Sequence, residues 1–203
     1  ADSGMVGTET TEHPDAFCNI DPHVVAADLA EQLADEHVHA VIGYDDNGTY
    51  GHPDHEQVHA VAHAAARPLA ASWVLDATYN REYLASLPDS DGLLDPNFAA
   101  AEADLTHFVA GEPWMSTKIE AIMHHRSQIP DDWDRENPDV DGFRRRFGTE
   151  WFIAEQVTTA PEPGAEFGLL ADVLQPKAAW EPPLERDGGL PGQSSPSAGD
   201  RKA

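Results

Sequence analysis

The sequence contains few basic side chains for its size. Its 203 residues include 12 Lys and Arg against 37 Asp and Glu, which gives a formal net charge of -25 at pH 7. A charge of this sign and size repels nucleic acids and anionic membrane surfaces, so we expect neither as a partner. A neutral or cationic small molecule is compatible with it, and most of the acidic side chains are expected to form a solvated surface.

Cysteine and long apolar runs are also nearly absent. Cys18 is the only cysteine, which excludes an internal disulfide framework and a clustered thiolate metal site. No apolar run approaches the ~18 residues that span a bilayer, and no signal peptide opens the sequence. We therefore expect a cytoplasmic protein. The sequence opens at Ala1 rather than at a methionine, so Ala1 need not be the natural start.

The order of the predicted elements indicates an α/β fold. Asp21 and Pro22 form a typical helix start, and an apolar stripe follows at Val25, Leu29 and Leu33. The patterns predict helices over residues 22–35, 53–68 and 117–128, and strands over residues 38–44, 72–79 and 151–153. The alternation of helix and strand favours a parallel sheet with crossover helices.

Composition divides the chain into two parts. Residues 1–156 carry all the predicted elements and form one domain. Residues 157–203 are rich in Pro, Gly and Ser, and this tail is expected to be disordered from about residue 181.

Residues 47–59 have the composition of an active site. They read Asn-Gly-Thr-Tyr-Gly-His-Pro-Asp-His-Glu-Gln-Val-His and lie between a predicted strand and a predicted helix, where open α/β sheets bind ligands. Two acids, Asp45 and Asp46, precede two imidazoles, His52 and His55. We expect these four side chains to converge.

One interpretation of this segment is a zinc peptidase. His55, Glu56 and His59 match the pattern His-Glu-x-x-His, in which both imidazoles bind zinc and the Glu activates water. In this chain, however, His55 falls in the first turn after a proline, and Ala65 occupies the position of the third histidine in the extended motif. The match is therefore better explained as coincidence. His59 and His63, one turn apart, are expected to serve packing or surface roles.

A second interpretation rests on the residues before the helix. Tyr50-Gly51-His52-Pro53-Asp54-His55 resembles the His-Pro-Asp-His signature of the LmbE-like, or PIG-L-type, zinc de-N-acetylases. That family includes N-acetylglucosaminyl-phosphatidylinositol deacetylases and the deacetylase and amidase of mycothiol metabolism. Further segments fit its elements in the right order: Asp2-Ser3-Gly4-Met5, Asp45-Asp46-Asn47-Gly48, and Lys118, Ala121, His125, Ser127 and Gln128.

The resemblance implies a Rossmann-like, three-layer α/β domain and specific roles in amide hydrolysis. His55 would bind one zinc ion. His52 would act as general acid or stabilise the tetrahedral intermediate, and Asp54 would orient His52. Tyr50 would reach the developing oxyanion. Zinc with three protein ligands lowers the pKa of its bound water to about 7, which produces a nucleophile for the amide carbon.

The resemblance also implies a sugar pocket and a missing element. Asp2, Met5 and Gln128 would contact the sugar of the substrate. The family's other signature, His-Pro-Asp-Asp-Glu, supplies two more zinc ligands and a general base, and His13-Pro14-Asp15-Ala16 does not match it. The remaining ligands are thus expected upstream of Ala1, the domain is expected to be incomplete at its N-terminal side, and these 203 residues alone are expected to be inactive.

The sequence therefore predicts a zinc-dependent hydrolase that removes the N-acetyl group from a GlcNAc-containing small molecule. The alternatives are a thiol-conjugate amidase of the same family, a non-catalytic remnant that acts as a binding module, and a His-Glu-x-x-His metallopeptidase. The sequence leaves open the acylated substrate and the oligomeric state.

Overall fold

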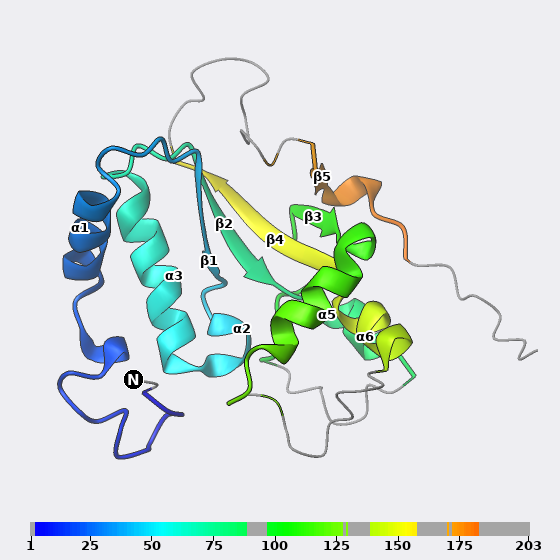
Figure 1. The fold of residues 1–203 in the computed structure, drawn as a ribbon, viewed down its shortest axis with the longest axis horizontal. Coiled ribbons are helices and arrows are strands. Elements are labelled where there is room, and N and C mark those ends of the chain that lie inside the picture. Colours follow the sequence, from blue (N-terminus) through cyan, green and yellow to red (C-terminus); the bar gives the residue numbers. More distant parts are fainter. Residues whose placement is uncertain are drawn as a thin grey trace, which may run out of the picture.

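A computed structural model describes residues 3–88, 97–127, 129, 139–157, 170 and 172–182. Figure 1 shows a twisted sheet with α1 and α3 beside its β1 edge and α5 and α6 toward the other edge. The strands are β1 (Ala40–Tyr44), β2 (Trp73–Thr78), β3 (His107–Ala110), β4 (Thr149–Gln156) and β5 (Leu174–Pro176). The helices are η1 (Phe17–Asn19), α1 (Pro22–Gln32), α2 (Gly48–Gly51), α3 (Pro53–Ala66), α4 (Arg81–Ser86), η2 (Glu112–Trp114), α5 (Met115–Met123), α6 (Val140–Phe147) and η4 (Lys177–Ala179).

The α/β class is confirmed, but the sheet is mixed rather than parallel. Its strand order is β1-β2-β4-β3-β5, and among these described strands only β1 and β2 pair in parallel. The pairs β2–β4, β3–β4 and β3–β5 are antiparallel. The crossover through α3 allows the parallel pair, because parallel neighbours need a long connection. At the end of the β3–β4 pair, the Gly111 N–H donates to the Gly148 carbonyl at 2.8 Å.

The β1-α3-β2 unit forms as the sequence predicts, with ends shifted by one or two residues. Helix α3 packs directly on β1, and a Cβ at Gly43 would lie only 2.8 Å from the Cβ of Ala62. A glycine at this position thus permits the close approach of helix and strand. Helix α1 begins as predicted, since the Asp21 side chain accepts from the His23 N–H at 2.9 Å.

Successive residues of β2 face opposite sides of the sheet, and each side has its own core. Val74 packs on the α3 side with Ala62, Ala66 and Ala71. Leu75 packs on the other side with Phe152 and Leu174. A third cluster is formed by Leu105, Phe108 and Trp151. On the Leu75 side, Ile42 of the edge strand β1 is 53% exposed.

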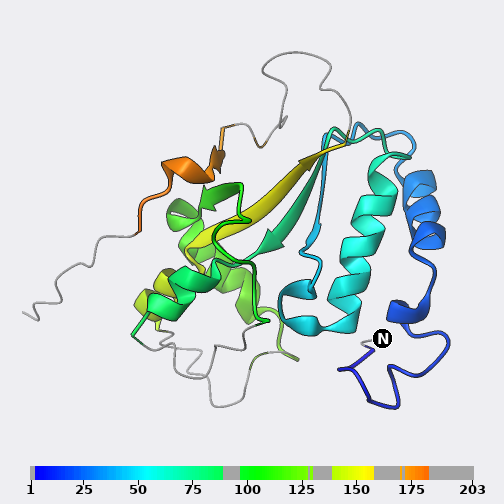
Figure 2. The ribbon, with the colours of Figure 1, turned by 180° about the vertical axis from the view of Figure 1, so that it is seen from behind.

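The folded region extends past residue 156, the boundary that composition predicts. Strand β5 pairs with β3, and its Leu174 is buried. The Trp180 ring lies 4.8 Å from that of Trp151 and 5.3 Å from that of Tyr83. Figure 2 shows this segment from behind, beside β3 and β4. Residues 183–203, most of the part expected to be disordered, lie outside the described residues.

Candidate active site

The segment that follows β1 is fixed by a buried carboxylate. Asp45, 3% exposed, accepts a hydrogen bond from the Thr49 N–H at 2.5 Å and another from the Thr78 hydroxyl. Thr49 has a φ of 69°, in the left-handed region that a threonine rarely adopts. The two bonds of Asp45 therefore hold a strained turn against the end of β2.

Gly48 and His55 are in close contact across this turn. Gly48 has a φ of +55°, and a Cβ there would lie 2.7 Å from the Cβ of His55. The Nδ1 of His55 is 3.2 Å from the Gly48 carbonyl, and its ring stacks on Tyr44 with centroids 4.1 Å apart. Since a carbonyl can only accept, Nδ1 carries the proton and Nε2 has the free lone pair. This is the tautomer of a metal-binding histidine.

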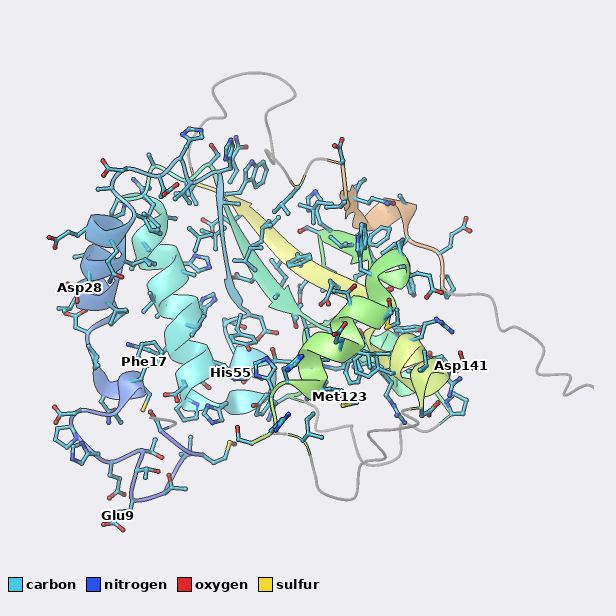
Figure 3. All side chains as sticks on the ribbon, in the orientation of Figure 1. Glu9, Phe17, Asp28, His55, Met123 and Asp141 are labelled. Carbon is cyan, nitrogen blue, oxygen red and sulfur yellow. The ribbon has the colours of Figure 1, made fainter. Side chains whose placement is uncertain are left out.

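His52 lies beside His55 at the start of α3, and His55 is labelled in Figure 3. The two ring centroids are 5.0 Å apart. The Nδ1 of His52 accepts from the Asp54 N–H at 3.2 Å and so caps the helix. This assigns the proton of the neutral ring to Nε2.

Tyr50 completes an aromatic cluster around the two histidines. Its ring is edge-on to His55 at 5.0 Å and to His52 at 6.0 Å between centroids. The residue is 46% exposed, so part of its surface is open to a ligand from solution. Helix α2 thus brings Tyr50 to the two imidazoles that the sequence groups with it.

Asp54 joins the N-terminal segment to this cluster. Its Oδ2 accepts from the Ser3 N–H at 2.9 Å, and its Oδ1 is buried without a hydrogen-bond partner in the described part of the chain. Burial alone would raise the pKa of Asp54, but hydrogen bonding by Ser3 and the nearby His52 together hold it below its ordinary value. The backbone N–H of Asp54 donates to His52 and contributes to the orientation of its ring.

The predicted sugar-binding residues are only partly described. Met5 is 46% exposed and lies two residues beyond the Ser3–Asp54 bond. Asp2 and Gln128 lie outside the described residues. Lys118, which belongs to the same late pattern as Gln128, donates to the Phe147 carbonyl at 2.7 Å and pairs with Glu150. This lysine therefore links α5 to the end of α6 and to β4.

One cluster of metal-ligating side chains was not anticipated from the sequence. Within the described ranges, only His59, His63 and Asp76 form a group of three whose ligand atoms all lie within 4.8 Å of one another. The spacing of His59 and His63 placed them on one helix face, but nothing in the sequence pointed to Asp76 as their partner. His55 belongs to no such group among these residues, so the expectation of further ligands beyond it stays a prediction.

No described helix has the length and apolar character needed to cross a membrane.

Comparison with known proteins gives relatives over most of the chain, although no family model matches. A 1D-myo-inositol 2-acetamido-2-deoxy-alpha-D-glucopyranoside deacetylase of Acidothermus cellulolyticus is 32% identical over 195 residues, covering 86% of this chain and 66% of the relative. A protein of the same name from Salinispora arenicola is 35% identical over 78% of this chain and 56% of its own length. One from Nocardia farcinica is 52% identical over 69 residues, which are 34% of this chain and 23% of that protein. In the two longer alignments, the chain spans about half to two thirds of the relative's length.

Proposed function

The chain belongs to the LmbE-like, or PIG-L-type, deacetylase family, and we propose from this that the protein is a zinc-dependent amide hydrolase. It removes the N-acetyl group from a small molecule that contains N-acetylglucosamine. The relatives are named for a GlcNAc-inositol substrate, 1D-myo-inositol 2-acetamido-2-deoxy-alpha-D-glucopyranoside. We propose a substrate of this class for the present protein.

The hydrogen bond from Ser3 to Asp54 is the observation that carries the proposal. It joins two segments 51 positions apart, and both resemble elements of the deacetylase site. One is the predicted sugar-binding segment at residues 2–5, and the other is the signature at residues 50–55. A chance match to either segment would not require the two to meet in space.

His55 fits the role of one zinc ligand. Its Nδ1 is engaged by the Gly48 carbonyl, and the stacked Tyr44 ring fixes its plane. Nε2 is therefore the atom that we assign to the metal. When bound, zinc would activate a water molecule and polarise the acyl carbonyl. The described residues supply no complete ligand set around His55, so we assign this chain one ligand only.

His52 and Tyr50 fit the roles of proton donor and oxyanion partner. The Asp54 N–H engages Nδ1 of His52, which places the proton of the neutral ring on Nε2, and this ring lies beside that of His55. The neutral ring can donate a hydrogen bond from Nε2 to the tetrahedral intermediate. After it takes up a second proton at Nδ1, in place of the bond from the Asp54 N–H, the imidazolium can protonate the leaving amine. The hydroxyl of the half-exposed Tyr50 can donate a hydrogen bond to the acyl oxygen. Met5, with Asp2 and Gln128, would contact the sugar.

Amine release from GlcNAc-inositol by the protein expressed from its complete coding sequence tests the proposal. His52→Ala is expected to lower kcat by about 10²–10⁴-fold, the usual contribution of a general acid, with zinc content unchanged. His55→Ala is expected to lose activity together with the zinc ion assigned to His55. His23→Ala, on the exposed surface of α1, is the control for removal of an imidazole and should keep full activity.

Two outcomes would refute the assignment. The first is full activity in the His52→Ala variant. The second is an enzyme that cleaves thiol-conjugate amides and leaves the N-acetyl sugar intact. Glu56→Gln distinguishes the peptidase hypothesis from the deacetylase proposal. It would abolish the activity of a His-Glu-x-x-His peptidase and leave the activity of a deacetylase largely intact. Glu56 is exposed, so this change is expected to be structurally mild.

A further inference from the structure

Two imidazoles of α3 converge on one buried carboxylate of β2. The Nε2 of His63 lies 3.1 Å from both carboxylate oxygens of Asp76. The Nδ1 of His59 lies 3.3 Å from the Oδ1 of Asp76. Asp76 is 7% exposed and sits in the middle of β2 on the side that faces α3. We propose that His59, His63 and Asp76 form a second metal site, which binds a divalent transition-metal ion and is separate from His55.

The spacing of the three ligand atoms fits a single small ion. Zinc binds His nitrogen and carboxylate oxygen at about 2.0–2.2 Å with tetrahedral geometry, so neighbouring ligand atoms lie about 3.3–3.5 Å apart. The observed separations from Asp76 Oδ1 are 3.1 Å to His63 and 3.3 Å to His59. The ligand atoms of His59 and His63 lie within 4.8 Å of each other, so small side-chain adjustments bring all three atoms to one ion.

A further oxygen atom that can bind a metal ion lies next to this group. The Tyr44 carbonyl is 3.0 Å from the Nδ1 of His59. In the metal-free chain, this carbonyl accepts a hydrogen bond from the Nδ1–H of His59. The ion would replace that proton when it binds. The carbonyl oxygen or a water molecule then supplies the fourth ligand. The side chains of His59 and His63 are 24% and 29% exposed, which leaves a path for the ion from solution.

Glu155 stands where an orienting carboxylate of a metal site is expected. Its Oε2 is 3.6 Å from the Nδ1 of His63, the ring nitrogen opposite the one that faces Asp76. Metal-binding histidines commonly pair their second nitrogen with a carboxylate, which fixes the ring and increases its basicity. Glu155 is on β4, so the site would link α3 to two adjacent strands.

The ligand types of this site, two imidazoles and one carboxylate, determine which metal ions it can bind. This donor set suits zinc, iron or nickel, whereas magnesium and calcium prefer oxygen ligands alone. His59 is one helical turn, about 6 Å along the axis, beyond His55. An ion here would hold α3 to β2 just below the His52–His55 cluster. The inference goes beyond the proposed deacetylase activity and does not depend on it.

Zinc binding by the 203-residue chain that carries His55→Ala tests the proposal. The His55→Ala change removes the zinc ligand assigned to deacetylation. Zinc binding by the second site is therefore measured without a contribution from His55. We expect about one zinc per chain after dialysis, with a Kd measurable by titration calorimetry. Adding His63→Gln should raise that Kd by at least about tenfold. Adding His23→Gln instead removes an exposed histidine of α1 and should leave the Kd unchanged.

Either of two results would overturn the proposal. It fails if the His55→Ala chain binds no zinc, or if His63→Gln leaves the Kd unchanged. Circular dichroism of the metal-free variants verifies that each is folded. If His63→Gln does not fold, the exposed Glu155→Gln replaces it and should also weaken binding. An unchanged Kd in Glu155→Gln would then count against the site.

Discussion

Asp45 and Thr78, 33 positions apart, share a buried hydrogen bond between the ends of the two parallel strands. The same carboxylate accepts from the Thr49 N–H. The aspartate therefore holds the turn at residues 45–49 against β2, and the His52–His55 cluster follows this turn directly.

Asp45→Ala is expected to lower the free energy of unfolding by about 3 kcal/mol, because it leaves the Thr49 N–H and the Thr78 hydroxyl buried without an acceptor. Urea denaturation followed by tryptophan fluorescence measures the loss. Asp46→Ala removes the neighbouring exposed carboxylate and should cost less than about 0.5 kcal/mol. Equal losses in the two variants would show that the bonds of Asp45 do not hold the turn.

Gly48→Ala is expected to cost more stability than Gly51→Ala. Both glycines have positive φ, +55° at Gly48 and +80° at Gly51. The backbone penalty of an alanine is about 1–2 kcal/mol at each position. At Gly48, a Cβ would also lie 2.7 Å from that of His55, whereas at Gly51 it meets nothing within 4 Å. We expect about 3 kcal/mol for Gly48→Ala and about 1 kcal/mol for Gly51→Ala by urea denaturation.

A reversed order would mean that the turn relaxes freely around residue 48. Gly48→Ala should also displace the His55 ring from its position stacked on Tyr44. In a proton NMR spectrum, the imidazole resonances of His55 would then lose the upfield shift that the Tyr44 ring causes.

His107 is expected to make the fold less stable as the pH falls. Burial in β3 lowers the pKa of His107 below its ordinary value of 6.5. Above pH 6.5 the imidazole is neutral in both states and contributes nothing. Below pH 6.5 the unfolded chain takes up the proton first, so stability is lost until the pH passes the folded pKa.

The unfolding free energies of the wild type and of His107→Gln, measured at pH 7.5, 6.5 and 5.5, test this sign. The wild type should lose more stability over the acid half of the range than the variant. His23→Gln removes an exposed histidine and should follow the wild-type profile. Parallel profiles for the wild type and His107→Gln would rule out a contribution of His107.

Trp180→Ala is expected to lower the free energy of unfolding by about 2 kcal/mol. Its ring packs on Trp151 and Tyr83 but stays partly exposed. The loss should therefore fall below the ~3–5 kcal/mol of a fully buried tryptophan. Trp114→Ala, at a side chain 49% exposed, is the control and should cost less than about 1 kcal/mol. An unchanged free energy of unfolding in Trp180→Ala would show that the stable domain ends near residue 156.

The sequence predicted well those features that are local. The strand–helix–strand unit over residues 40–78 has clear periodicity, and the signature at residues 50–55 is contiguous. Strand β3 has only four residues, and β5 has three and ends at Pro176, so neither provides a pattern long enough to identify. The antiparallel direction of β4 depends on the path of the chain between distant elements, which no local pattern contains.

Contacts between side chains that are distant in the sequence could not be predicted either. The pairing of Asp76 with His59 and His63 depends on which side of β2 faces α3, and a shift of one residue would reverse it. The contact of Ser3 with Asp54 joins segments that only the resemblance to a family had grouped. The catalytic, metal and sugar-binding roles assigned to individual residues stay predictions.

The mixed sheet also has a consequence for synthesis on the ribosome. Strand β2 pairs with β1 through the nearby crossover, but its other neighbour, β4, begins about 70 residues after β2 ends. At ~5–20 residues per second, the nascent chain would carry β2 with one open edge for roughly 4–14 s before β4 is made. An open strand edge can pair with another chain. Chaperones that shield nascent strands would therefore matter most for this protein during that interval.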